Sequence, residues 1–348
     1  MQTPGPFGPH NTDAGSLVAA PDNGTQVVLT FDDNRLASTL FGQYGQNLAL
    51  IERRLAVVAT SRGNQVTLEG SREACEQARR VLEGLYDRLK HGDEVTQGDV
   101  DGAIRLALSQ GSLFDFDPAS ARESFEEINL RKRRVRARTP AQDAYLRALK
   151  RHALVFATGP AGTGKTWLAV AQAVQLFERK EVDRIVLSRP AVEAGERLGF
   201  LPGDMREKVD PYLRPIYDAL YDLMDARIVE RALQTTEIEI APLAFMRGRT
   251  LSNAAISLDE AQNTTAMQMK MLLTRLGENS RMMVTGDPSQ VDLPPGQTSG
   301  LTEAVRLLDG VEGIGHVRFT AADVIRHELV ARIVEAYDNA AAAKRERP

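Results

Sequence analysis

The sequence is poor in cysteine, in long apolar runs and in excess charge of either sign. Cys75 is the single cysteine among 348 residues, which excludes an internal disulfide and a cysteine-rich zinc site and is typical of a reducing compartment. No apolar run approaches the roughly 18 residues that cross a bilayer, and the N-terminus lacks a basic-then-apolar signal pattern. A formal net charge of −4 argues against a uniformly basic surface. We therefore expect a cytoplasmic protein whose contacts with nucleic acid, if any, are local.

Composition and periodicity divide the chain into five segments. The first is rich in proline and glycine and poor in apolar residues, so burial cannot offset the entropy lost on ordering it. The predicted segments are a disordered tail (1–24), a small α+β domain (25–92), a connector that ends in a basic run (93–138), a larger α/β domain (139–340) and a frayed C-terminal tail (341–348).

The larger domain alternates short apolar runs with helical patterns. This alternation is typical of parallel strands joined by helices, so it predicts an α/β fold with a mainly parallel sheet flanked by helices on both faces. The predicted strands are residues 153–157, 184–188, 237–241, 254–258, 281–285 and 316–319.

Residues 159–166 follow the first of these strands and precede a predicted helix. They are Gly159, Pro160, Ala161, Gly162, Thr163, Gly164, Lys165 and Thr166. This order fits the phosphate-binding pattern G-x-x-x-x-G-K-[ST], in which backbone N–H groups and the helix N-terminus converge on one anion. Lys165 is expected to reach the β- and γ-phosphates, and the Thr166 hydroxyl to bind Mg²⁺. The pattern predicts a nucleoside triphosphate site.

Two acidic residues directly follow the apolar run at 254–258. Because a parallel strand ends there, Asp259 and Glu260 are expected to emerge beside the phosphate loop. Asp259 is predicted to hold Mg²⁺ through its water shell, and Glu260 to accept a proton from the water that attacks the γ-phosphorus. The alternative is a helix N-cap with a solvated neighbour.

The strand at 281–285 runs into a second polar segment at the same predicted edge. Its Gln290 carries an amide that can bond both a γ-phosphate oxygen and the attacking water, so we predict that it senses the terminal phosphate. A plain Asp-Pro turn is the alternative.

The choice of base is indicated by two features. The usual guanine-reading patterns Asn-Lys-x-Asp and Thr-Lys-x-Asp are absent from the sequence. Gln142 lies some two dozen residues before Lys165, where its amide could bond both edges of adenine. ATP is therefore favoured over GTP.

Together these segments resemble the PhoH-like ATPases, including the bacterial YbeZ-type proteins with a KH-like N-terminal domain. The matching segments are residues 159–166, 187–192 with 195–196, 240–243 with 246–250, 259–263, 285–290 and 323–327. The resemblance implies a P-loop NTPase fold of the RecA-like kind, nucleotide motifs similar to those of superfamily 1 helicases, action on RNA, and association with a YbeY-type endoribonuclease.

The chain has length for one ATPase lobe only, whereas a monomeric helicase closes two lobes on one nucleotide. We therefore expect a transition-state arginine to come from a neighbouring subunit, which requires a head-to-tail homo-oligomer such as a ring of six. Arg326, Arg247 and Arg249 are the candidates, and surface salt bridges or RNA contacts are their alternative roles. Arg189 follows a strand where such enzymes hold the RNA backbone, so it is a further candidate RNA contact.

The small N-terminal domain contains the loop Gly42, Gln43, Tyr44 and Gly45. A G-x-x-G loop followed by helix, strand, turn, strand and helix resembles a KH-like domain, which binds single-stranded nucleic acid through that loop. The loop lacks the cation that binding-competent KH loops usually carry, so a docking or oligomer-contact module is an equal alternative.

The basic run at 131–138 also admits two interpretations. It is either a strap that neutralises RNA phosphates beside the ATPase lobe or a solvated linker.

The leading hypothesis is an RNA-stimulated ATPase that remodels or unwinds RNA, with ATP and Mg²⁺ as cofactors. The alternative is a nucleotide-gated adaptor that recruits an endoribonuclease without unwinding. A P-loop phosphotransferase is a distant third, since no separate acceptor-binding lid is evident.

Overall fold

The computed structural model describes residues 25–110, 125–190, 205–294 and 296–325. The chain forms two compact units, one ending at Asp87 and the other beginning at Arg88. No helix in the described ranges is long and apolar enough to cross a membrane. The predicted tails at 1–24 and 341–348 lie outside the described residues.

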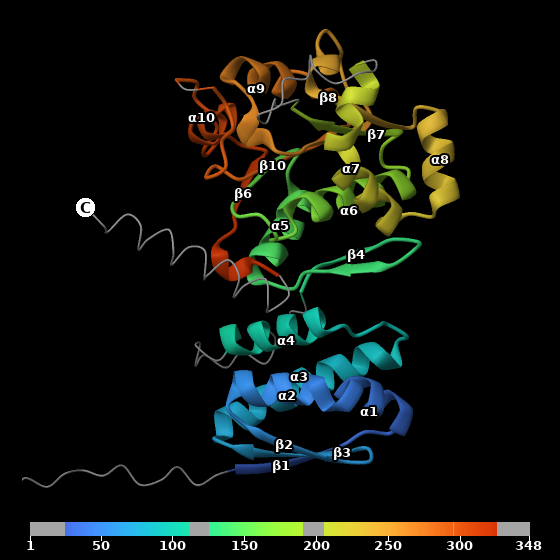
Figure 1. Ribbon diagram of the computed structural model, residues 1–348, viewed down its shortest axis with the longest axis vertical. Helices are drawn as coiled ribbons and strands as arrows, with labels where there is room; N and C mark the ends of the chain where they lie inside the picture. Colours follow the sequence, from blue (N-terminus) through green and yellow to red (C-terminus); the bar gives the residue numbers. More distant parts are fainter. Residues whose placement is uncertain (1–24, 111–124, 191–204, 295, 326–348) are drawn as a thin grey trace, which may run out of the picture. The chain divides into compact units, whose positions relative to one another are not determined.

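The first unit is a three-stranded antiparallel sheet with helices on one face (Figure 1). Its elements are β1 (Thr25–Thr30), α1 (Asn34–Phe41), α2 (Gln46–Leu55), β2 (Val58–Arg62), β3 (Gln65–Gly70) and most of α3 (Arg72–Lys90), whose last three residues belong to the second unit. The strand order is β1-β3-β2, so β3 pairs with both neighbours. Leu40, Ile51, Val66, Leu68 and Leu82 are fully buried between the helices and the sheet, which is the amphipathic pattern that the sequence shows here.

The second unit contains a six-stranded sheet in which every pairing is parallel. Its strands are β6 (Leu154–Thr158), β7 (Arg184–Arg189), β8 (Ile238–Pro242), β9 (Ala254–Leu258), β10 (Arg281–Gly286) and β11 (Ile314–Arg318). The order across the sheet is β11-β6-β10-β9-β7-β8. The predicted α/β fold is confirmed, and each predicted strand corresponds to one of these six.

Helices cover both faces of this sheet (Figure 1). They are α5 (Pro140–Arg151), α6 (Lys165–Glu178), α7 (Met205–Leu223), α8 (Ala226–Gln234), α9 (Ala266–Leu273) and α10 (Gly300–Leu307). On one face of the sheet, helices α5, α6, α7 and α8 pack in one buried cluster with the strand side chains that point to that face. On the other face, α9 and α10 pack in a second cluster with the alternate strand side chains. Because both faces are covered, strands such as β9 are buried at every position and read as continuous apolar runs.

Local signals in the sequence fix the ends of several helices. Thr139 caps α5 by accepting a hydrogen bond from the Gln142 N–H, and Pro140 occupies the first helical position. Thr265 and Gln268 form a reciprocal capping box at the start of α9. These caps set where each helix begins relative to the sheet edge.

Part of the predicted connector belongs to the core of the second unit. After α4 (Gln97–Gln110), a hairpin of β4 (Glu127–Asn129) and β5 (Arg134–Arg136) carries the basic run. Ile128 and Val135 are 0% and 1% exposed and pack into the cluster beneath α5 and α6. The charged residues on either side of Val135 hide this period-two pattern, which is why the sequence suggested a strap or a linker.

Candidate nucleotide-binding site

The predicted phosphate loop connects β6 to α6. Gly159, Gly162 and Gly164 have φ values of 140°, 81° and 85°, which only glycine adopts without strain. At Gly159 a Cβ atom would also lie 2.4 Å from the carbonyl oxygen of Phe319. The phosphate loop and the segment that follows β11 can therefore come this close only because residue 159 has no side chain. Gly164 is the N-cap of α6, and it places the loop at the positive end of that helix.

Lys165 is 7% exposed and lies folded against this loop. Its Nζ donates hydrogen bonds to the carbonyl oxygens of Gly159 and Pro160, both at 2.7 Å, and to the Thr163 hydroxyl at 3.3 Å. Burial lowers the pKa of the Lys165 ammonium, and the nearby carboxylates oppose that shift. Anionic phosphate oxygens would satisfy this buried ammonium better than neutral carbonyls do.

The Thr166 hydroxyl meets Asp259 although the two residues are 93 positions apart in the chain. Thr166 Oγ1 donates to Asp259 Oδ1 at 2.7 Å, and Thr285 Oγ1 donates to the same oxygen at 2.8 Å. Asp259 is 6% exposed at the end of β9. A hydroxyl and a carboxylate side by side are hard oxygen donors that suit Mg²⁺. Within the described ranges, no group of three or more His, Cys, Asp or Glu side chains is placed to hold a metal ion.

Glu260 occupies a left-handed conformation, with a φ of 52°. Its Oε1 accepts a hydrogen bond from Arg189 Nη2 at 2.7 Å, and its Oε2 accepts one from Gln262 Nε2 at 2.5 Å. Arg189, at the end of β7, also donates to the Tyr212 carbonyl on α7 at 2.8 Å. The residue predicted to contact RNA therefore pairs with the predicted catalytic base. Non-glycine residues with positive φ concentrate at functional sites, since the surrounding structure must hold them there.

Gln262 and Asp287 lie in the matching segments 259–263 and 285–290, but the sequence alone assigned them no role at this edge. Gln262 is 1% exposed, and its Oε1 accepts a hydrogen bond from the Asp287 N–H at 3.0 Å while its amide holds Glu260. Asp287 is 6% exposed, its Oδ1 is bonded by Ser289, and its Oδ2 has no partner among the described atoms. Both follow buried strands, the same signal that identified Asp259 and Gln290.

The structure places Gln290 in an exposed turn after β10, on the sheet edge that carries the phosphate loop. Its backbone N–H donates to the Asp287 carbonyl at 3.0 Å, so the turn predicted as the alternative is present. The role of the exposed Gln290 amide as a γ-phosphate sensor remains a prediction.

Gln142 is 5% exposed and uses both ends of its amide inside the protein. Its Nε2 donates to the Thr163 carbonyl in the phosphate loop at 2.9 Å, and its Oε1 accepts from the Arg138 N–H at 2.8 Å. In this conformation the side chain braces the phosphate loop, and the contact with adenine remains a prediction.

The candidate arginines differ in their surroundings. Arg249 forms a two-pronged ion pair with Glu239, with both N–O distances at 2.7 Å, and the hydrogen bond from Arg249 lowers the pKa of that carboxyl. Arg247 is exposed. Arg326 and the segment at 195–196 lie outside the described residues.

In the first unit, the G-x-x-G loop is held in an unusual backbone shape. Gly42, Tyr44 and Gly45 have φ values of 77°, 54° and 74°, and the Tyr44 side chain is fully exposed. Asn47 Nδ2 donates to the Leu40 carbonyl at 2.8 Å, and a Cβ at Gly42 would lie 2.9 Å from Asn47. The loop is thus preshaped, and its binding of RNA stays a prediction.

A parallel sheet whose first strand leads through a glycine loop to a helix, with Thr166 bonded to a strand-end carboxylate, is the architecture of the P-loop NTPase fold. The chain belongs to the PhoH family, because the family model described as "PhoH-like protein" matches residues 134–338.

Curated relatives agree with this assignment. A "PhoH-like protein" of Bacillus subtilis is 48% identical over 87% of this chain and 94% of its own length. One from Mycobacterium tuberculosis is 47% identical over 86% of this chain and 84% of its own length. One from Synechocystis is 43% identical over 90% of this chain and 95% of its own length.

Proposed function

We propose that the protein is a Mg²⁺-dependent ATPase that remodels or unwinds RNA. The observation that supports hydrolysis most directly is the grouping of Lys165, Thr166, Asp259 and Glu260 at one sheet edge. When bound, Mg²⁺ would be held by Thr166 and Asp259 and would neutralise charge on the phosphates. Lys165 and the loop N–H groups would hold the phosphate oxygens.

In the hydrolytic step, a water attacks the γ-phosphorus, the bond to the β-phosphate oxygen breaks, and Glu260 accepts the water proton. Glu260 is bonded to both Arg189 and Gln262 here, so its carboxylate is oriented from two sides. Since Arg189 also bonds the Tyr212 carbonyl, a movement of α7 would change the position of the base. This gives a physical route by which a ligand on α7 affects turnover.

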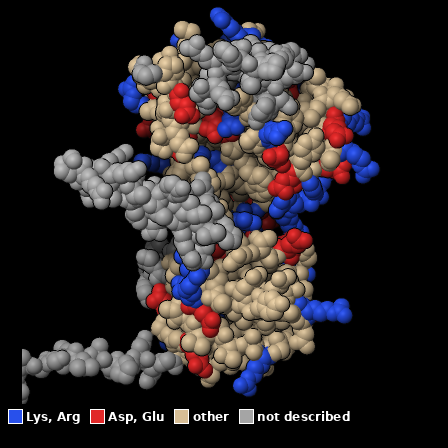
Figure 2. Space-filling view, viewed as in Figure 1, with Lys and Arg blue, Asp and Glu red and all other residues tan. Residues whose placement is uncertain are grey.

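The RNA-related part of the proposal is supported by the family resemblance and by the preshaped loop around Tyr44. Lys and Arg are interspersed with Asp and Glu on the face shown in Figure 2, so RNA would be held by local patches. If Arg131 to Arg136 form such a patch, their substitution lowers RNA affinity and reduces its salt dependence. Unchanged affinity and salt slope would assign them another role.

The alternative function is a nucleotide-gated adaptor for an endoribonuclease of the YbeY type. The observation that favours it is the ion pair between Glu260 and Arg189, which fits a base held until a partner binds. We further propose a head-to-tail homo-oligomer, with six subunits as the expected ring, because an ATPase with a single lobe would take its transition-state arginine from a neighbouring subunit. The ring would be excluded if sedimentation experiments show a strictly monomeric enzyme that has full turnover.

The deciding experiment measures ATP hydrolysis with and without single-stranded RNA, in parallel with displacement of a labelled strand. The remodelling function predicts RNA-stimulated turnover coupled to displacement. Turnover without displacement supports the adaptor. Absence of ATP binding in calorimetry would refute both.

A further inference from the structure

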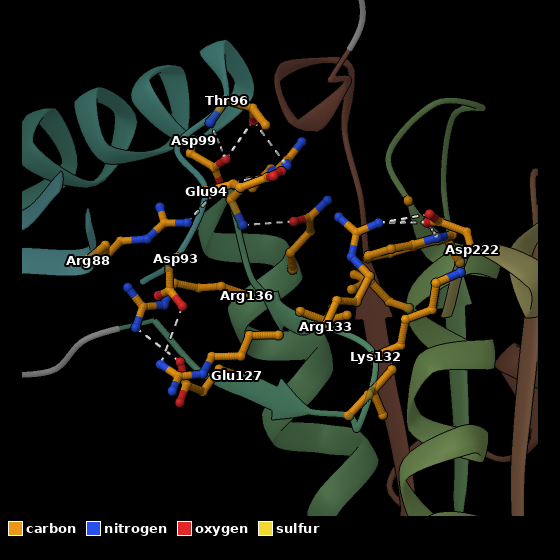
Figure 3. A pocket seen from close by; sticks show the side chains of 18 of the residues that line it. Arg88, Asp93, Glu94, Thr96, Asp99, Glu127, Lys132, Arg133, Arg136 and Asp222 are labelled. Carbon is orange, nitrogen blue, oxygen red and sulfur yellow. Dashed lines mark hydrogen bonds and ion pairs between the residues drawn. The ribbon is translucent and has the colours of Figure 1, made fainter. Parts of the chain in front are cut away.

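A cavity of about 910 Å³ lies in the second unit directly beside the phosphate loop. Its lining includes Gly162 and Gly164 of the phosphate loop and the β4–β5 hairpin with its basic run. Figure 3 shows the Lys132, Arg133 and Arg136 side chains of that hairpin. Its volume falls in the range of about 300–1,000 Å³ that is usual for small-molecule sites. The cavity is therefore continuous with the place where the triphosphate would bind.

Trp167 lines this cavity and is the only tryptophan in the chain. It directly follows Thr166 in the first turn of α6, so its position is fixed relative to the phosphate loop. Its indole Nε1 donates to Asp222 Oδ2 at 2.9 Å, and the Arg133 guanidinium lies 5.4 Å from its ring centroid. Arg133 in turn donates to both Asp222 oxygens, at 2.8 and 3.0 Å. An aromatic face, a cation and a carboxylate thus meet at one spot.

The hairpin turn is held in place at this end of the cavity. Lys132 donates to the carbonyl oxygens of Tyr221 and Met224 at the C-terminus of α7, where helix carbonyls lack partners and attract cations. Figure 3 shows Arg133 and Asp222 joined on one side of the cavity, with Glu127 and Arg136 at the other. The cavity wall is therefore built from ordered, mutually bonded side chains.

The charges of this wall favour a flat polar ligand over a polyanion. Most arginines of the basic run already have a carboxylate partner, which are the pairs Arg133–Asp222, Arg134–Asp93, Arg136–Glu127 and Arg138–Asp99. Binding of RNA phosphates draws on cations that are not neutralised by the protein. The pairs leave both donors and acceptors for the edges of a base, while Trp167, Leu168 and Ile325 offer apolar surface.

We propose that the nucleoside of the bound nucleotide lies in this cavity and stacks on Trp167, and that the basic hairpin closes the nucleoside end of the site. The proposal rests on the proposed function, since it requires a nucleotide on the phosphate loop. It assigns the run at 131–138 to nucleotide recognition in place of an RNA strap. Arg133 and Asp222 then position the indole ring.

The first test uses the fluorescence of Trp167 in the full-length protein. Mg²⁺-ATP is expected to change the emission with the same midpoint that calorimetry gives for binding. Inorganic triphosphate fills the phosphate loop but carries no nucleoside, so it should bind while leaving the emission nearly unchanged. Equal emission changes with ATP and triphosphate would overturn the proposal, because the indole would then report only movement of the loop.

The second test measures affinities of variants by calorimetry. Trp167→Ala should weaken ATP binding about tenfold, which corresponds to roughly 1.4 kcal/mol for one lost base–aromatic stack, and should leave triphosphate binding unchanged. Trp167→Phe should restore most of the affinity. Arg133→Ala should also weaken ATP binding while leaving triphosphate binding unchanged, because Arg133 positions the indole ring. Arg147→Ala is its matched control, since Arg147 is paired with Asp143 on α5 and does not line the cavity.

The outcomes separate this inference from the proposed function. If ATP does not bind the wild-type protein at all, the proposed function fails. If ATP binds and Trp167→Ala binds ATP and triphosphate as the wild type does, only the nucleoside site is refuted. If RNA without nucleotide changes the emission, and Trp167→Ala weakens RNA but not ATP, the cavity belongs to RNA.

Discussion

Replacing Glu260 with glutamine removes the negative charge of the predicted base while preserving its size. The amide oxygen of the introduced glutamine can still accept a hydrogen bond from Arg189, as Glu260 Oε1 does now at 2.7 Å. The phosphate loop, Lys165 and the Thr166–Asp259 hydrogen bond do not involve this side chain. The variant should therefore bind ATP with nearly wild-type affinity.

The structural and catalytic effects of Glu260→Gln differ in size. The side chains of Arg189 and Glu260 are 20% and 36% exposed, so the lost ion pair costs about 1 kcal/mol or less and lowers Tm by roughly 2–4 °C. Loss of a general base costs about 100-fold or more in rate, equivalent to at least roughly 2.7 kcal/mol. A small stability loss with a large rate loss would identify a chemical role.

The assay is single-turnover hydrolysis of saturating Mg²⁺-ATP, with calorimetry of the same preparations. Glu312→Gln is the matched control, because Glu312 is exposed in the turn before β11. The control should keep wild-type turnover. If Glu260→Gln hydrolyses ATP within a few-fold of the wild type, Glu260 is not the base and the assignment is wrong.

Three further predictions follow from individual contacts. Lys165→Ala should abolish ATP binding in calorimetry, because it removes the buried ammonium, whereas retained heat of binding would contradict that role. Gly159→Ala should lower Tm and ATP affinity together, since its Cβ would lie 2.4 Å from the Phe319 oxygen at a φ of 140°; a neutral effect would refute the close approach. Burial tends to raise the pKa of Asp99, but Arg138, Thr96 and Arg88 outweigh it and lower the pKa. The stabilisation that ionised Asp99 provides is thus present above about pH 4 and is lost as pH falls through the lowered pKa. Asp99→Asn should therefore flatten the acid side of a Tm–pH curve, and a curve identical to that of the wild type would exclude the effect.

Much of the fold could be predicted from the sequence because two of its signals, the apolar strands and the glycines of the phosphate loop, are local. Strands such as β9, buried at every position, read as apolar runs, and glycines at 159, 162 and 164 mark a loop that no other residue forms without strain. The hairpin β4–β5 was missed because a single buried Val135 lies between arginines, too short a pattern to outweigh the charge.

The sequence by itself determined the phosphate loop, the parallel alternation and the acids at the end of β9, since each depends on neighbouring residues and on backbone geometry. Only the tertiary structure decided which side chains meet there. Arg189 reaches Glu260 across 71 residues, and Gln262 bonds Asp287 across 25, because β7, β9 and β10 end at one sheet edge. The tertiary structure likewise brought Arg133 of the basic run to Trp167. The order of the residues does not show this, because Arg133 pairs with Asp222, an acid from a distant segment.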